Sequence, residues 1–457
     1  KGQWGSLALT SSTTYQNIRG IAYGDATQSS GGIQDLGAFA LTGVISDLPN
    51  TALLTSLSSK VRRFTQEFRA SDTFFDGHLD AQAGIFFSHE ADLLTIPGFY
   101  LFNKTTGAAL QPNYFLGFAP VLDAEIGSRY TEYSGYANLD LHITDKFDIL
   151  GGVRESTNRQ HFEENYTGTY IGIVEYLTNG FPNGDVLAYG SSSTGNDFNY
   201  LVSPRYKIND DNMVYARFAN GYRPGGANAF PPGLGAPATF QPDTVTSYEV
   251  GYKGQWLDRT LTLDIAGFWN DWNNIQIQTT LGAGFQGFIN GPSAQTRGFE
   301  LTAQWRPIER LTLGLNGGYT KANLTGDAPG AGALSGDELP FVPKLTGAIT
   351  ADYSWPVMSG WMADVGGSVN YIGSRMSGFV GNGTTINGYG VPVPSFTTVN
   401  LNAGLTHGPV TVMLYARNLS NSHGIVYVPV ISSALTTYQN ASVIPPLTVG
   451  GQITVAF

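Results

Sequence analysis

Few residues in this chain have the types and spacing that catalysis or metal binding requires. The histidines are scattered and form no dense ligand motif, and the cluster considered for a metal ion is His161 with Glu163 and Glu164. Imidazole and carboxylate groups suit divalent metal ions, but a solvated surface loop explains this cluster more simply. Asp210 and Asp211 lie where a tight turn is expected, and aspartate stabilises turns by bonding its own backbone. We therefore expect no metal ion and no paired-acid catalysis.

The chain also lacks the sequence motifs of the common enzyme classes. It contains no nucleophile elbow and no phosphate-binding loop. Cysteine is absent, which excludes disulfides, zinc–thiolate sites and a thiol nucleophile. We predict that the chain is not an enzyme and that it has no catalytic residues, cofactor or metal site.

A further set of charged residues is placed regularly rather than clustered. Each occupies a polar position in a segment where apolar and polar residues alternate, so in a β-strand the set would share one face. We predict that these side chains line a water-filled lumen and either dock another domain through charge-assisted hydrogen bonds or only keep the lumen hydrated. They are Glu249, Lys253, Asp264, Glu300, Arg306 and Asp352.

The clearest alternation lies at the end of the chain. One face there carries Leu447, Val449, Gly451, Ile453, Val455 and Phe457, and the other carries Thr448, Gly450, Gln452, Thr454 and Ala456. The first face suits lipid and the second suits water. A soluble barrel would place the apolar residues inside, but charged residues at the polar positions favour a membrane barrel, because a lumen tolerates them and lipid does not.

The composition agrees with membrane-spanning strands. Only 13% of residues are charged, and 42% hydrophobic residues coexist with a mean hydropathy of −0.09. The sequence has no run of about 18 consecutive apolar residues, the length that a spanning helix needs. The formal charge of −11 disfavours nucleic acid as a partner.

About sixteen alternating segments of roughly ten to fifteen residues follow one another, starting at Trp4–Tyr15. Short and long connections alternate between them, as in an up-and-down antiparallel barrel with one tight rim and one elaborated rim. The short turns are expected near residues 72–77, 144–147, 209–212, 256–259, 306–309, 355–360 and 407–409. The long loops, where ligand recognition is expected, lie near residues 25–58, 89–125, 162–196, 224–241, 281–295, 325–340, 378–394 and 420–446.

Five stretches, in their order and spacing, resemble the β-barrel of TonB-dependent receptors. One is a strand that ends in Gly-aromatic-Arg-Pro-Gly, and another ends in Ile-Gln. The stretches are Tyr215–Gly226, Thr246–Lys253, Phe268–Gln276, Gly298–Leu301 with Arg306-Pro307, and Tyr415–Leu419. Phe457, with Val455 and Ile453 before it, resembles the carboxy-terminal signal that the outer-membrane assembly machinery reads in such barrels.

The resemblance implies that residues 1–457 are one transmembrane β-barrel domain in the outer membrane of a Gram-negative bacterium. Family barrels have about 22 strands and an amino-terminal plug. We therefore expect an all-β, antiparallel, up-and-down barrel of which this chain supplies about sixteen strands. The plug and the first strands are expected outside it, because an open sheet edge in lipid is costly.

The resemblance also implies a function and partners. Loops would bind a scarce solute such as a ferric siderophore, cobalamin or an oligosaccharide, and the TonB complex would open the lumen by acting on the plug. The expected surroundings are outer-membrane lipid and lipopolysaccharide. Two alternatives remain open, namely a passive sixteen-stranded porin and a structural barrel in a larger envelope assembly.

Overall fold

The structure, a computed structural model, describes residues 2–25, 51–96, 99–103, 105–107, 123–167, 186–228, 237–280, 286–380, 390–428, 430–432, 437–439 and 441–456. These residues are mostly β-strand, and the helical structure among them is a single 3-10 turn, η3 (Pro329–Ala331). None of the described helical residues belongs to a helix long and apolar enough to cross a membrane.

Sixteen long strands form the main sheet, and each pairs antiparallel with the next long strand along the chain. The first six are β2 (Leu7–Asp25), β3 (Thr51–Phe74), β4 (Leu79–Ile96), β6 (Asp123–Thr144), β7 (Phe147–Thr167) and β8 (Val186–Asn209). The next five are β9 (Asn212–Arg223), β12 (Asp243–Trp256), β13 (Leu261–Asn273), β16 (Ala294–Trp305) and β17 (Leu311–Leu324). The last five are β18 (Leu345–Met358), β19 (Trp361–Ile372), β22 (Phe396–His407), β23 (Val410–Arg417) and β28 (Thr448–Val455).

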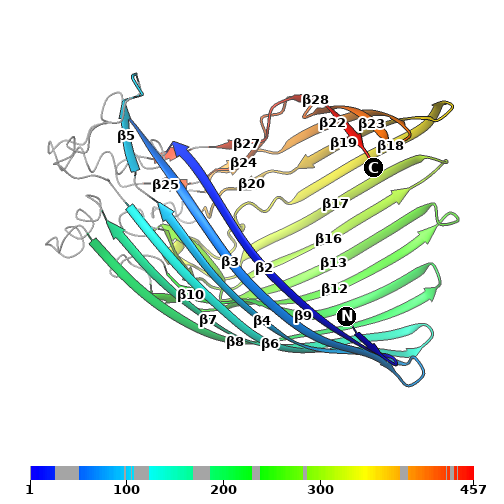
Figure 1. The fold of residues 1–457 in the computed structure, drawn as a ribbon, viewed down its shortest axis with the longest axis horizontal. Helices are drawn as coiled ribbons and strands as arrows, with labels where there is room; N and C mark the ends of the chain where they lie inside the picture. The colour runs from blue at the N-terminus through cyan, green and yellow to red at the C-terminus, as the bar shows by residue number, and fades with distance from the viewer. Residues whose placement is uncertain are drawn as a thin grey trace.

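Figure 1 shows these strands side by side in one strongly curved sheet, from β2 in blue to β28 in red. Two short strands extend it, since β1 (Gly2–Trp4) pairs with β2 and β5 (Phe99–Asn103) pairs with β3. The prediction of an all-β, antiparallel fold of about sixteen strands is therefore confirmed.

The short turns fall where the sequence predicts them, but the first strands are longer than predicted. β3 begins at Thr51 and β7 ends at Thr167, inside stretches predicted to be loops. The predicted first segment is also divided, because a turn at Gly5–Ser6 separates β1 from β2. The alternation of apolar residues could not reveal these extensions, because a strand with water on both faces needs no apolar face.

The long connections of the later strands fold into small hairpins. These are β10 (Gly226–Ala227) with β11 (Thr239–Phe240), β14 (Gln276–Thr280) with β15 (Gln286–Asn290), β20 (Arg375–Met376) with β21 (Pro392–Val393), β24 (Ile425–Tyr427) with β27 (Ser442–Val443), and β25 (Val430–Ser432) with β26 (Thr437–Gln439).

The buried apolar cluster lies among these connections and the strand ends beside them. We call it the loop core, and it comprises Ile275, Ile277, Ala294, Ala322, Leu324, Ala328, Ala331, Ala333, Leu339 and Phe379. Large apolar residues on the strands are exposed instead, as at Ile349 (60%) and Ile453 (72%). The loop core therefore packs around the connections, whereas many large apolar residues of the described strands stay exposed for an apolar surrounding.

Candidate functional site

The strand registers place alternate residues on two faces that continue from strand to strand. Lys253 lies opposite Asp264, and Asp264 lies opposite Thr302 on the next strand. We call this face the polar face; it also carries Glu249, Glu300, Asp352 and Gln452. The other, the apolar face, carries Leu313, Val365, Leu401, Val412, Ile453 and Val455.

The predicted lumen residues thus share a face, but they do not form one site. Lys253 Nζ lies 2.6 Å from Asp264 Oδ2, and Glu249 accepts a hydrogen bond of 2.7 Å from Tyr215. Glu300 and Asp352 lie on β16 and β18, further round the sheet. That they line a lumen stays a prediction.

Four further predicted residues lie at or beyond the strand ends. Arg306 follows the last residue of β16, so the strand register does not place its side chain. Ile453 and Val455 end β28 on the apolar face. Phe457, the last residue of the predicted assembly signal, lies outside the described residues.

The His161 cluster is arranged differently from the expectation. His161 lies within β7 rather than in a loop, and its Nε2 is 3.0 Å from Glu163 Oε1. Glu164 is the next residue on the strand, so its side chain points to the opposite face. It is 1% exposed, whereas Glu163 is open to solvent. The three groups therefore cannot converge on one metal ion.

A polar cavity of about 550 Å³ lies between the first long strands and the connection after β9. A cavity of this volume falls within the usual size range of small-molecule sites. We call it the wall cavity. Its lining comprises Arg63, Thr65, Phe86, Ser88, Glu90, Asp92, Ser128, Tyr130, Glu132, Gln160, Arg223, Pro224, Gly225, Phe240 and Gln276.

Sequence reasoning did not identify this cavity, although two of the family motifs reach it. Arg223-Pro224-Gly225 belongs to one motif and Gln276 to another. Apart from Phe240 of β11, the remaining lining residues come from β3, β4, β6 and β7, which lie far from these motifs in the sequence. The signal that could have located the cavity is the pair of motifs, because both interrupt the alternation at strand ends.

Ion pairs hold the charged side chains of the wall cavity. The Arg63 guanidinium contacts the carboxylate of Glu90 on the neighbouring strand. Arg154 Nη2 lies 2.8 Å from Glu132 Oε1, and its guanidinium stacks over the ring of Phe86. Charge-assisted bonds of this kind are short and directional, so the wall between β3 and β7 is cross-linked by them.

A network of hydrogen bonds around Asp243, which we call the Asp243 knot, holds the side of the cavity that faces the strands. Asp243 is 2% exposed, and its Oδ2 accepts bonds from Arg223 Nη2 (2.5 Å) and from the backbone N–H of Gln276 (3.0 Å). The Gln276 side chain in turn donates to the carbonyls of Pro224 (2.9 Å) and Gln241 (3.1 Å). The two family motifs therefore meet in one structure that joins the connections after β9 and β13.

Asn228 makes a second link between the same two connections. Its Nδ2 donates to the carbonyls of Pro237 and Phe288 at 2.8 Å each, and its Oδ1 accepts a bond of 2.7 Å from the N–H of Phe288. The rings of Phe240 and Phe288 also pack together. Asn228 is 1% exposed, and a buried amide satisfied in this way specifies one arrangement of its partners.

Two residues fasten the later connections. Arg375 donates to the carbonyl of Ile425 at 2.8 Å, and its burial lowers the pKa of its guanidinium. Asn418, in the motif after β23, has a φ of 52° and donates from Nδ2 to the carbonyls of Ser422 and Pro445. Asparagine tolerates this left-handed backbone better than most residues, which explains its place in the motif.

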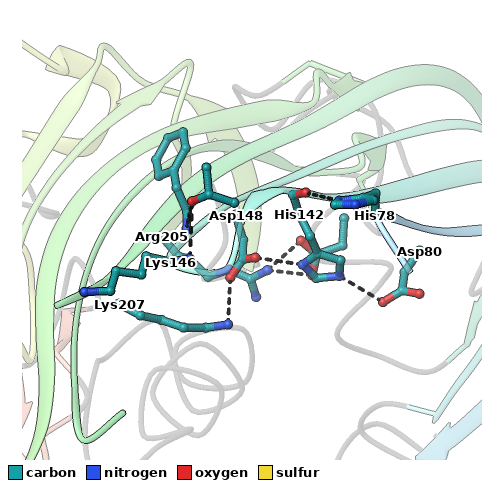
Figure 2. A network of polar contacts seen from close by, with 10 residues as sticks. His78, Asp80, His142, Lys146, Asp148, Arg205 and Lys207 are labelled. Atoms are coloured by element: carbon teal, nitrogen blue, oxygen red, sulfur yellow. Dashed lines mark hydrogen bonds and ion pairs between the residues drawn. The ribbon is translucent and has the colours of Figure 1, made fainter. Parts of the chain in front are cut away.

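A separate polar network lies at the short-turn ends of β4, β6, β7 and β8 (Figure 2). His142 Nδ1 shares a hydrogen bond of 2.7 Å with Asp148, and His142 Nε2 lies 3.2 Å from Asp80. Arg205 Nη2 bonds both oxygens of Asp140 at 2.5 and 2.6 Å, reaching from β8 across β7 to β6. These contacts cross-link four neighbouring strands at the end opposite the wall cavity.

The curved antiparallel sheet, with its polar and apolar faces and elaborated connections at one end, is the architecture of a membrane β-barrel. The family described as "TonB dependent receptor-like, beta-barrel" matches residues 1–419, and the chain belongs to this family. Its members are outer-membrane transport receptors rather than enzymes.

Curated relatives include a pesticin receptor and a catecholate siderophore receptor. The chain is 30% identical over 249 residues to the pesticin receptor of Yersinia enterocolitica, covering 54% of this chain and 34% of that protein. It is 24% identical over 373 residues to the catecholate siderophore receptor Fiu of Escherichia coli, covering 76% of this chain and 44% of that protein. The chain thus spans less than half the length of these relatives.

Solved structures show the same fold. The ferric yersiniabactin uptake receptor FyuA from Yersinia pestis superposes with a TM-score of 0.69 at 20% identity, covering 89% of this chain and 58% of that one. The ferric-catecholate import receptor Fiu from E. coli superposes with a TM-score of 0.64 at 17% identity, covering 99% and 65%.

Proposed function

We propose that this chain forms the wall and the ligand-binding loops of a receptor that imports a scarce solute across the outer membrane. The polar face lines the lumen, the apolar face contacts lipid, and a plug elsewhere in the protein gates the path under the action of the TonB complex. The solute class is that of ferric siderophores, which the names of several relatives specify.

The wall cavity is the observation that carries this proposal. Its polar lining comes from the face that also bears Glu249 and Asp264, so it opens on the proposed lumen. Two connections that the family motifs mark close its other side through the Asp243 knot. A binding site between the wall and fixed loops can hold a solute before the lumen opens.

The test is solute uptake by the whole protein in a strain that lacks its other ferric-siderophore receptors. Growth under iron limitation on a mixture of siderophores is expected to require both this protein and TonB. The substitution Ser128→Trp fills the wall cavity and is expected to lower uptake at least about tenfold.

The matched control is Arg129→Trp, which places the same side chain on the other face of β6. It is expected to leave uptake close to that of the natural protein. Uptake that continues at the same rate without TonB, together with steady ion conductance in a planar bilayer, would contradict the proposal and indicate a passive porin.

A further inference from the structure

The wall cavity has more negative charge than its basic residues can balance. Arg63 is paired with Glu90, and Arg223 is paired with Asp243. Glu132 is paired with Arg154, which lies just outside the lining. After these pairs are formed, the lining contains no further Arg or Lys among the residues that the structure describes.

Asp92 is the carboxylate that remains. It lies on the polar face of β4, two residues beyond Glu90, and it lines the cavity. Its Oδ1 is covered by protein and accepts no hydrogen bond within the described structure. The Asp92 carboxylate also lies against that of Glu90. A covered carboxylate oxygen without a donor is costly, and a cation bound against these carboxylates would lower that cost.

The opposite end of the same wall, near the short turns, has a similar excess of acidic over basic side chains. A second cavity of about 610 Å³ at this end is lined by Asp72, by Asp80, which lies 3.2 Å from His142, and by Asp140, which is paired with Arg205 outside the lining. Among its described lining residues there is no Arg or Lys. Over the polar face of β3 to β8 as a whole, carboxylates outnumber basic side chains. A solute that moves along this wall therefore meets a surplus of negative charge.

We propose that the wall cavity selects a solute that carries a protonated amine or a similar cationic donor, and that it discriminates against polyanions. The cationic group bonds Asp92, while hydroxyl and amide groups of the solute bond Ser88 and Gln160, and Phe86 and Phe240 cover its apolar part. This assignment rests on the proposed function, since it names the solute class of the same site.

The arginines of the site do not offset this preference. The guanidinium groups of Arg63 and Arg223 are already paired with Glu90 and Asp243, so an anion bound to either arginine would lie beside a carboxylate. Like charges that lie close together repel each other. A solute with a cationic donor meets no such repulsion.

The test compares three ferric trihydroxamate chelates that differ only at one end. One ends in a free ammonium group, one is acetylated and neutral, and one is succinylated and anionic. Affinities are measured by calorimetry on the purified whole protein in detergent. The ammonium form is expected to bind at least about tenfold more tightly than the succinylated form, as one charge-assisted hydrogen bond would give.

Three variants test whether Asp92 causes the expected preference for the ammonium form. Asp92→Asn is expected to reduce the affinity ratio to within about twofold, whereas Asp92→Glu, which retains the charge, is expected to preserve it. The matched control Asp76→Asn makes the same chemical change in a short turn, where the residue has a φ of 55°, and is expected to change nothing.

Equal affinities for the three chelates, tighter binding of the succinylated form, or binding of none of them would overturn the assignment. An unchanged ratio in Asp92→Asn would also overturn it. None of these results bears on TonB-dependent uptake or on its loss in Ser128→Trp, so the proposed function is tested separately.

Discussion

The first six long strands of the main sheet, β2 to β8, differ from the last ten, β9 to β28, in their length and in their connections. Among the sixteen long strands, those from β2 to β8 have 18 to 24 residues, whereas those from β9 to β28 have 8 to 14. The long strands carry ion pairs on the polar face, as at Arg154 and Glu132. The short strands are followed by connections that fold around the loop core.

This difference explains where the wall cavity lies. Residues such as Glu90 and Tyr130 come from the extended strands, and Arg223 and Gln276 come from the folded connections. The extended strands supply a continuous polar surface, and the loop core holds the connections against it. The wall cavity therefore lies where the extended strands meet the folded connections. A substitution in one of these two regions can change it without changing the other.

The largest effect is expected from the substitution Leu324→Ala in the loop core. Leu324 is 2% exposed, and truncating a buried leucine costs about 2 to 5 kcal/mol. Protease cleavage within residues 325–344 is expected to accelerate. The matched substitution Leu414→Ala changes an apolar-face residue that is 64% exposed, and it is expected to leave that cleavage unchanged. Equal cleavage in the two variants would show that the connections do not depend on this core.

A smaller effect is expected from Asp243→Asn, which weakens the knot between the two connections. The neutral amide keeps the shape but loses the charge that holds Arg223, at a cost of about 1.5 to 3 kcal/mol. Hydrogen exchange is expected to increase at residues 223–228 and 286–292 and to stay unchanged in β3 and β4. An equal increase of exchange in the connections and in β3 and β4 would mean that these two regions do not open independently.

The smallest effect is expected from Lys253→Met on the polar face. Its ion pair with Asp264 is half open to solvent, and such pairs contribute about 0 to 1 kcal/mol. The Tm in detergent is therefore expected to stay nearly unchanged. A large loss of Tm would indicate that polar-face ion pairs, rather than backbone pairing and the loop core, stabilise the wall.

The sequence predicted the strands wherever one face is apolar. The alternation at Leu311–Tyr319 and Leu447–Val455 located β17 and β28, and turn residues located the short connections. It could not predict the last part of β7 (158–167), because both faces of this segment carry polar residues, such as Gln160 on one face and Glu163 on the other. There the strand is stabilised by its neighbours β6 and β8, which are distant in sequence.

The candidate site was harder to predict than the fold. The polar-face residues Glu249 and Asp264 followed from periodicity, but the wall cavity is lined jointly by Arg63 and Gln160 on the strands and Gln276 on a connection. Such contacts are set by strand register and by how the connections fold, and neither is visible in local patterns. The motifs marked the residues of the Asp243 knot without showing that they meet.

The central claim is that the polar face contacts water in a lumen and the apolar face contacts lipid. The chain has no natural cysteine, so single cysteines can be introduced and spin-labelled without further changes. Neighbouring pairs are Thr312→Cys with Leu313→Cys on β17 and Asn402→Cys with Leu401→Cys on β22.

The most direct measurement is the accessibility of these four labels in lipid vesicles to oxygen and to a water-soluble nickel chelate. The labels at positions 312 and 402 are expected to collide mainly with the nickel chelate, because they would lie in water. The labels at positions 313 and 401 are expected to collide mainly with oxygen, which concentrates in lipid. The reverse pattern, or no difference within each pair, would contradict the account.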